Sequence, residues 1–204
     1  MAADELGPWE PLTVPQVVDL LRGYDQPWWI AGGQAIDLFV GRQTRPHGDV
    51  DVQVLHRDQC AVRAHMHDWD LHAADPPGAL RPWPLDEVLD EAIHDVWCRP
   101  APDVPWSLQL MLLSTEEDRW VFRRDRRIGG SLATFGLRRD GVPFVAPEVQ
   151  LLYKSKSPRA TDDVDFEEAL PLLDGRQRDW LITSLETHVE EHPWISRLRG
   201  DVFS

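Results

Sequence analysis

The sequence predicts an α+β fold, in which a small mixed β-sheet flanked by helices (residues 1–145) precedes a helical part (residues 146–204). Three observations predict it. Short segments that alternate apolar and polar residues recur up to Val145, which is typical of strands. From Pro147 onward the apolar residues recur at helical spacing. The 204 residues are 42% hydrophobic, which is enough for one core, and they contain no internal repeat and no low-complexity linker.

In the first part, helices and strands are expected to alternate. One helix is expected over 14–24, with Pro15 near its start, and another over 34–41, closed by Gly41. A third helical pattern covers 58–69, and the proline-rich stretch 71–86 is expected to be mostly loop. Strands are expected over residues 27–33, 49–55, 94–99, 106–113 and 119–125, and a hairpin that turns at Asp140–Gly141 over 137–145.

Three helices are expected in the second part, over 147–156, 161–173 and 175–192. The first begins with a proline, which suits the start of a helix. The second begins with Thr161, and we interpret Asp162, Asp163 and Asp165 as residues that cap it rather than as metal ligands.

Composition limits the classes of function. The net charge of −14 argues against a nucleic-acid partner, because proteins that bind phosphate backbones present basic patches. The N-terminus lacks a secretion signal, and no apolar run approaches the roughly 20 residues that span a bilayer. A cytoplasmic protein without a membrane partner is therefore expected, with Cys60 and Cys98 as reduced thiols. Four tryptophans are expected in the core: Trp28, Trp29, Trp97 and Trp106.

The stretch from Trp28 to Val54, WWIAGGQAIDLFVGRQTRPHGDVDVQV, carries the strongest functional signal. In its last strand, alternation places three valines on one face and Asp49 and Asp51 on the other. Two carboxylates on one face repel each other, and a divalent cation between them removes the repulsion; hard oxygen ligands suit Mg²⁺. The pair Gly32–Gly33 lies between a strand and the helix that opens at Gln34, where backbone amides and the helix dipole favour a phosphate.

These residues match neither a dinucleotide-binding GxGxxG pattern nor a P-loop. The run GGQAIDLFVGRQTRPHGDVDV instead resembles the minimal nucleotidyltransferases of the polymerase-beta-like superfamily, and most of all the adenylyltransferases that act on aminoglycosides and lincosamides. The matching positions are Gly32, Gly33, Asp37, Gly41, Arg42, Thr44, Arg45, His47, Asp49 and Asp51. The resemblance implies a nucleotidyltransferase domain that transfers a nucleoside monophosphate from a magnesium-bound triphosphate. It also implies that Asp49 and Asp51 bind the metal and that Gly32 and Gly33 contact the triphosphate.

One position departs from the superfamily pattern. Its members usually have a third carboxylate on a later strand, and the strand expected there carries Gln109. An amide takes no proton at neutral pH and binds Mg²⁺ more weakly than a carboxylate does. Asp95, in a neighbouring expected strand, is the first substitute as a catalytic residue, and His94 beside it also accepts protons near neutral pH. Local hydrogen bonding at a strand end explains either residue equally well.

Three cations are candidate triphosphate contacts. Arg45 suits a bidentate contact with phosphate, and a salt bridge that holds its loop against an acidic neighbour is the alternative. Lys154 and Lys156 lie near the expected end of a helix. There they either reach the triphosphate or only complement the helix dipole.

The expected function is magnesium-dependent transfer of AMP from ATP to a hydroxyl of a small acceptor. A cationic acceptor is favoured because residues 161–204 contain eleven acids and four arginines, a net charge of −7. One alternative is a catalytically weak nucleotide-binding protein of the same fold, which Gln109 motivates. Another is an interaction module, such as the nucleotidyltransferase-like half of a toxin–antitoxin pair. The acceptor, the donor base and the oligomeric state, a homodimer included, stay open.

Overall fold

The computed structural model describes residues 6–189 and 191–200. The helices are α1 (Val14–Leu20), α2 (Gly32–Val40), α3 (Gln59–His65), α4 (Pro147–Lys154), α5 (Ala160–Ala169), α6 (Gly175–His188) and α7 (Pro193–Arg199). The strands are β1 (Trp28–Ile30), β2 (Asp51–Leu55), β3 (Asp70–Ala73), β4 (Arg81–Pro82), β5 (Asp95–Arg99), β6 (Leu108–Leu113), β7 (Thr115–Glu116), β8 (Arg119–Val121), β9 (Gly129–Ser131), β10 (Gly136–Arg139) and β11 (Val142–Val145).

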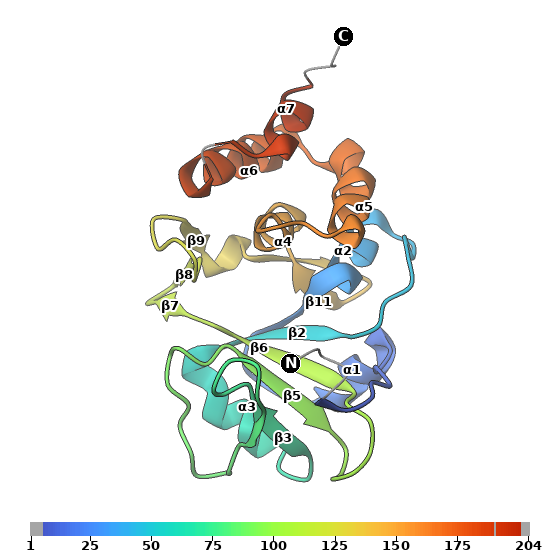
Figure 1. The fold of residues 1–204 in the computed structure, drawn as a ribbon, viewed down its shortest axis with the longest axis vertical. Helices are drawn as coiled ribbons and strands as arrows, with labels where there is room; N and C mark the ends of the chain where they lie inside the picture. Colours follow the sequence, from blue (N-terminus) through green and yellow to red (C-terminus); the bar gives the residue numbers. More distant parts are fainter. Residues whose placement is uncertain (1–5, 190, 201–204) are drawn as a thin grey trace.

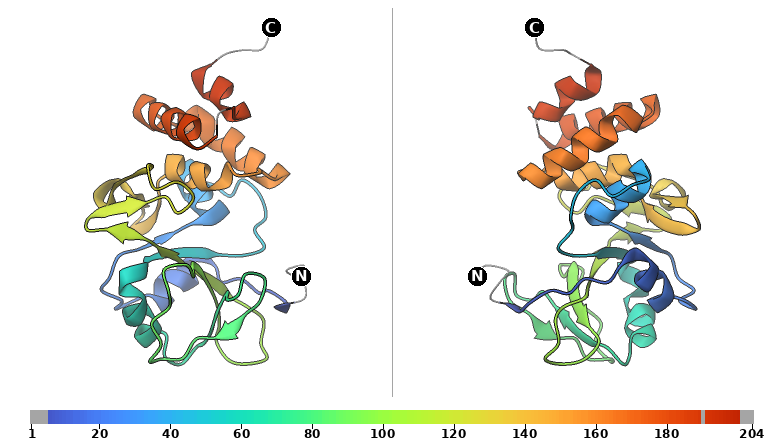
Figure 2. Two further views of the ribbon diagram at one scale, coloured as in Figure 1. Left: turned by 60° about the vertical axis from the view of Figure 1, so that its left-hand side comes forward. Right: turned by 90° about the vertical axis from the view of Figure 1, so that its right-hand side faces the viewer.

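The main layer is an eight-stranded mixed sheet with the order β10-β11-β1-β2-β6-β5-β3-β4, and β7, β8 and β9 form a separate small sheet. Helices α4 to α7 stack on one side of the molecule, next to α2 and β11 (Figure 1). The strands β3 and β5 lie at the opposite end (Figure 2). The α+β class predicted from the sequence is confirmed.

Strand β2 lies at the centre of the large sheet and positions the aspartate motif. It runs antiparallel to β1 and parallel to β6, with Asp51 opposite Gln109. Val50, Val52 and Val54 are fully buried, as the alternation predicts, and α3 packs near β2. β2 begins at Asp51, so Asp49 and Val50 precede the strand instead of starting it. The valine face therefore anchors the motif in the core.

Two predictions for the first part of the chain are wrong in detail. The glycine pair does not form a turn before the helix, because α2 already begins at Gly32. The stretch 71–86, expected to be loop, contributes β3 and β4 to the large sheet. In β3, the buried residues Leu71 and Ala73 alternate with the half-buried residues Asp70 and His72. The prolines in and around this short pattern indicate a loop. The strands are stabilised by pairing instead of local propensity, since β3 pairs with β5 and β4 pairs with β3.

The expected strand over 119–125 also differs, since only Arg119–Val121 is extended and it belongs to the small sheet. The hairpin at Asp140–Gly141 is present, with both residues at positive φ (51° and 82°). This backbone conformation suits the two-residue turn that the Asp-Gly pair predicts.

The last expected helix ends at His188 rather than at residue 192, and α7 follows from Pro193. The sequence signals for α7 are the proline in its first turn and Gly200, at φ 78°, just after its end. Residues 190 and 201–204, at the end of the predicted helical part, lie outside the described residues, and the division at 145/146 stays a prediction. In the described ranges, no helix is long and apolar enough to cross a membrane. Cys60 is an exposed free thiol and Cys98 a buried one.

Candidate active site

The start of α2 brings the glycine pair against the aspartate motif. Gly32 has a φ of 65°, and its N–H donates to Oε1 of Gln150 on α4 at 2.9 Å. A Cβ on Gly32 would overlap the Asp51 carboxylate, and a Cβ on Gly33 would overlap the side chains of Arg45 and His47. Only glycine therefore allows these side chains to lie directly against the backbone of the first turn.

Alanine at position 32 tests this close approach. We expect Gly32→Ala to lower the free energy of unfolding by about 1–3 kcal/mol, because the positive φ and the overlap with Asp51 add strain. Thermal unfolding measures the change. Gly175→Ala is the matched control, because its Cβ would meet open space in the first turn of α6. Equal effects of the two variants would contradict the packing described for Gly32.

Asp51 is a largely buried carboxyl group surrounded by other acids. Burial, followed by the charge of Asp49 and more weakly that of Asp95, raises its pKa from 3.8 to about 7, whereas Lys154 and Arg159 act in the opposite direction. Within the described residues, no hydrogen-bond donor contacts the Asp51 carboxylate. A negative charge at this position is therefore costly unless a cation is close to it.

The donor chemistry fits a hard divalent cation. Asp49 and Asp51 offer carboxylate oxygens close to the first turn of α2, where a phosphate would also supply oxygen ligands. Within residues 6–189 and 191–200, no three acidic, histidine or cysteine side chains are grouped closely enough to hold a metal by themselves. Mg²⁺ tolerates such a site because it commonly keeps waters and substrate phosphates among its ligands.

Gln109 lies directly opposite Asp51, on the neighbouring strand β6. Its Nε2 donates to Oδ1 of Asp95 on β5 at 3.1 Å. Asp51, Gln109 and Asp95 therefore form a row on one face of the sheet. His94 just precedes β5; its Nδ1 is buried with no partner in the described structure, and burial, with Arg123, lowers its pKa.

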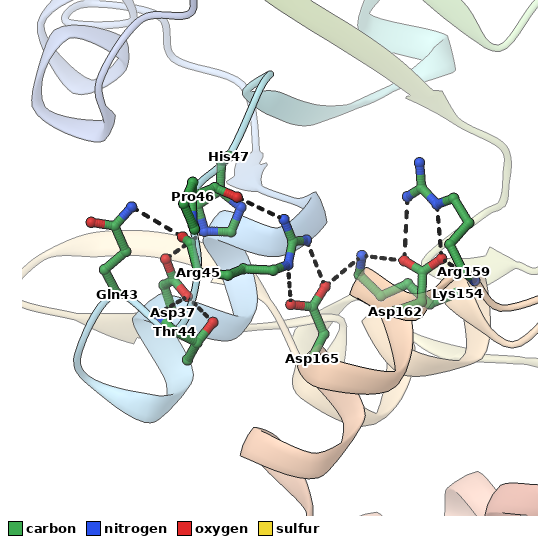
Figure 3. Close-up of polar contacts among 10 residues, drawn as sticks. All are labelled: Asp37, Gln43, Thr44, Arg45, Pro46, His47, Lys154, Arg159, Asp162 and Asp165. Atoms are coloured by element: carbon green, nitrogen blue, oxygen red, sulfur yellow. Dashed lines mark hydrogen bonds and ion pairs between the residues drawn. The ribbon is translucent and has the colours of Figure 1, made fainter.

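Two acids of α5 hold the cations of the site (Figure 3). Nε and Nη2 of Arg45 donate to the two oxygens of Asp165, each at 2.8 Å. Nζ of Lys154 lies 2.8 Å from Asp165 and 2.9 Å from Asp162, which also accepts from Nε of Arg159 at 3.0 Å. Burial alone would raise the pKa of Asp165, but the bonds from Arg45 and Lys154 outweigh it and hold the pKa below its usual value. This group of five side chains is referred to below as the α5 ion network.

The loop between α2 and β2 is fixed by Asp37. Thr44 donates through its N–H and its hydroxyl to Oδ1 of Asp37, at 2.9 and 2.6 Å. Nε2 of His47 lies 2.6 Å from Oδ2 of the same carboxylate. Arg45, between them, is thus held by Asp37 through its neighbours and by Asp165 directly (Figure 3).

The structure brings most of the predicted site residues together around the start of α2. Gly32, Gly33, Arg45, Asp51 and Lys154 belong to this group, and Asp49 and Asp95 lie close enough to shift the pKa of Asp51. Gln34 also lines a separate surface pocket beside α2, together with Asp37 and Arg139. Lys156 is exposed and makes no ion pair with another described residue.

Sequence reasoning missed several residues of the site. Asp162 does cap α5, since it accepts from the N–H of Arg159 at 3.0 Å, but it also pairs with Lys154. For Asp165 the capping interpretation is wrong, because this residue is fully buried against two cations. The available signal was the spacing of three between Asp162 and Asp165, which places both on one face of a helix. Gln150 and Arg159 gave no signal that separated them from ordinary helix residues.

Comparison with known proteins shows what part of the chain, and which fold, it shares with others. Residues 13–74, which contain the glycine pair, the loop and both aspartates, match the aminoglycoside-2''-adenylyltransferase family. The lincosamide antibiotic adenylyltransferase LnuA, solved with lincomycin, is 15% identical, with a TM-score of 0.52 over 78% of this chain and 97% of LnuA. No curated protein sequence matches the chain.

The antibiotic-resistance factor ANT(2'')-Ia is similar in two structures. Its solution structure is 15% identical, with a TM-score of 0.55 over 85% of this chain and 89% of that one. Its complex with adenylyl-2''-tobramycin is 13% identical, with a TM-score of 0.53 over 86% and 98%. The resemblance predicted from the sequence is confirmed: the chain has the nucleotidyltransferase fold of these proteins, and its residues 13–74 match the aminoglycoside-2''-adenylyltransferase family.

Proposed function

We propose that this chain is an adenylyltransferase that transfers AMP from ATP to a hydroxyl of a small acceptor, with Mg²⁺ held by Asp49 and Asp51. One observation carries the proposal: the largely buried Asp51 carboxylate lies beside another acid and against the first turn of α2. A divalent cation there offsets both the burial and the repulsion. The matched family supports ATP as the donor.

The first turn of α2 supplies the phosphate site. The N–H of Gly32 is used by Gln150, whereas those of Gly33 and Gln34 donate to no acceptor within the described residues. These two amides, at the positive end of the helix dipole, are available for phosphate oxygens. Lys154 and Arg45 place positive charge nearby, but both form ion pairs with Asp165. They therefore act on phosphate chiefly through long-range electrostatic attraction rather than by direct contact. Lys156, being exposed, is at most a peripheral contact.

Bound Mg²⁺ would polarise the phosphoryl group and stabilise the charge that develops on pyrophosphate. In the reaction, the acceptor hydroxyl oxygen forms a bond to the α-phosphorus, and the bond from this phosphorus to the pyrophosphate oxygen breaks. Asp95 takes the hydroxyl proton in our proposal, because Gln109 orients one of its oxygens and leaves the other available. The products are the adenylylated acceptor and pyrophosphate.

The test uses the full chain with ATP, Mg²⁺ and either tobramycin or lincomycin. Mass spectrometry is expected to show an acceptor that has gained one adenylyl group, with matching release of pyrophosphate. Asp49→Asn should lose at least about 100-fold in rate, since charge stabilisation at a reaction centre is typically of this size. Transfer that is unaffected by Asp49→Asn would refute the assignment of the site.

A catalytically weak nucleotide-binding protein is the second candidate. The observation that favours it is Gln109, an amide placed directly opposite Asp51 where a third acid would complete the group. Titration calorimetry separates the two candidates. Magnesium-dependent binding of ATP without transfer to any acceptor supports the second, and transfer supports the first.

A further inference from the structure

The three cations of the α5 ion network are not equally free to leave it. Arg45 and Lys154 have only 17% and 8% of their side chains exposed, and both pair with Asp165, which is fully buried. If either cation moved away, a buried carboxylate would lose a partner, which is costly. Arg45 and Lys154 are therefore fixed parts of the network.

Arg159 is the cation that can leave. Its side chain is 77% exposed, and within the described residues it pairs only with Asp162, through Nε at 3.0 Å and Nη2 at 3.3 Å. An exposed ion pair contributes little to stability, so breaking it costs little. Asp162 would still accept from Nζ of Lys154 at 2.9 Å and from the backbone N–H of Arg159 at 3.0 Å. The guanidinium group can therefore exchange Asp162 for another anion without leaving a buried charge unpaired.

The guanidinium group of Arg159 lies near the candidate metal site. Its third nitrogen, Nη1, has no acceptor in the described part of the chain, and in Figure 3 the free end of the group points away from α5. The bonds to Asp162 raise the pKa of Arg159 most, and the charge of Asp49 adds to this effect. Arg159 in turn opposes the rise in the pKa of Asp51. A free donor is thus available beside both aspartates.

The sheet order separates Arg159 from the proposed base. β5, which carries Asp95, lies beyond β6 on one side of β2, and β1 lies on the other side. Helix α2 follows β1, and α5, which starts directly after Arg159, packs against α2 and α4 (Figure 1). In phosphoryl transfer the attacking and leaving oxygens lie roughly in line, on opposite sides of the phosphorus. With the acceptor hydroxyl at Asp95, pyrophosphate leaves on the side where Arg159 lies.

We propose that Arg159 releases Asp162 when the donor binds and holds the pyrophosphate part of the nucleotide. The inference rests on the proposed function and adds a phosphate-contacting residue to it. A guanidinium group can make two parallel hydrogen bonds to phosphate oxygens. The free amides of Gly33 and Gln34 serve the same oxygens from the α2 side. In the nucleotide-free chain, the Asp162 carboxylate takes the position on Arg159 that a phosphate takes later.

Calorimetric titration of the full chain with MgATP and, separately, with magnesium pyrophosphate tests this contact. Arg159→Gln is expected to weaken binding of both probes about 10- to 100-fold, the range for a hydrogen bond to a charged group. Arg159→Lys keeps the charge without the planar fork and should recover part of the loss. Arg22→Gln is the matched control, because Arg22 is 78% exposed and also pairs with an acid three residues away, Asp19. The control should change neither Kd.

Thermal unfolding without ligand separates the contact from a structural role. Arg159→Gln and Arg22→Gln should both melt within about 3 °C of the wild type, since each removes one exposed ion pair. Weaker binding of both probes at this unchanged stability supports the contact. A large drop in the melting temperature of Arg159→Gln, unchanged binding of MgATP, or weaker binding of MgATP but not of pyrophosphate would each overturn it.

The same variants separate this inference from the proposed function. If MgATP binds through Arg159 but no adenylylated acceptor forms, the proposed transfer fails and the contact stands. If Arg159→Gln binds MgATP like the wild type and transfers AMP at the same rate, the contact is overturned and the transfer stands. Wild-type protein that binds neither probe would overturn both.

Discussion

Replacing Asp51 with asparagine is expected to stabilise the metal-free protein at pH 8 while abolishing magnesium-dependent binding of ATP. The pKa of the Asp51 carboxyl is about 7 in the folded chain, against an ordinary value of 3.8. Between these values the folded state binds a proton that the unfolded state has lost, so stability falls as the pH rises from about 4 to 7. Above pH 7 the whole penalty is present.

The penalty is at most on the order of 4 kcal/mol, because the pKa is raised by about three units and each unit corresponds to about 1.4 kcal/mol. Asparagine carries no charge, so Asp51→Asn avoids this penalty and should melt several degrees higher at pH 8 in a chelator. Near pH 4 the two proteins should melt together. Added Mg²⁺ should raise the melting temperature of the wild type alone, because only the carboxylate attracts the ion.

Thermal unfolding at pH 4 and pH 8, with chelator or with Mg²⁺, provides the measurement. Asp68→Asn is the matched control, since the Asp68 side chain is 84% exposed and its replacement should leave the melting temperature unchanged. A lower melting temperature of Asp51→Asn at pH 8 would show that the carboxylate is stabilised by contacts that the structure does not contain.

Asp165→Ala is expected to lower the free energy of unfolding by about 3–5 kcal/mol, the largest loss among the substitutions considered. Asp165 is fully buried and is the common partner of Arg45 and Lys154. Its removal leaves Arg45 without its carboxylate and Lys154 with Asp162 alone, and an uncompensated buried charge costs several kcal/mol. The pKa of Asp165 is depressed, so its contribution is complete above the ordinary carboxyl range and is lost as the pH falls through the lowered pKa.

Urea unfolding at pH 7 and at pH 3 measures this loss, which should shrink at the lower pH. Glu167→Ala removes an ion pair with Arg197 from the same helix, but both side chains are about half exposed. This control should cost less than about 1 kcal/mol. Comparable effects of the two substitutions would mean that the α5 ion network is no more stabilising than a surface pair.

The parts of the site that sequence predicted are those encoded within one short segment. Gly32, Gly33, Asp49 and Asp51 lie within about 20 residues of one another, and the strand and helix between them follow from alternation and from the Gly41 cap. The glycine pair encodes two features of the site. Gly32 has a φ of 65°, and a side chain there would overlap the Asp51 carboxylate. Whether the aspartates bind metal stays a prediction.

The parts that sequence did not predict depend on contacts between distant segments. Nothing near Arg45 indicates that its partner is Asp165, which is 120 residues away, or that Gln150 caps the N–H of Gly32. The strands β3 and β4 were missed for a related reason: β3 depends on pairing with β5 and β4 on pairing with β3, while the nearby prolines indicate a loop. Pairing between distant segments contributes most where local propensity is weakest.

The partnership of Arg45 with Asp165 has a consequence for how the chain is made. Synthesis proceeds from the N-terminus, so the complete glycine and aspartate motif leaves the ribosome well before α5 does. β1 likewise lacks its parallel neighbour until β11 is made, because Ile30 pairs with Phe144. Pairings of such sequence separation close slowly. The candidate site is therefore completed late in folding, and a chain shortened before Asp165 would contain every residue of the motif but lack the carboxylate that holds Arg45 and Lys154.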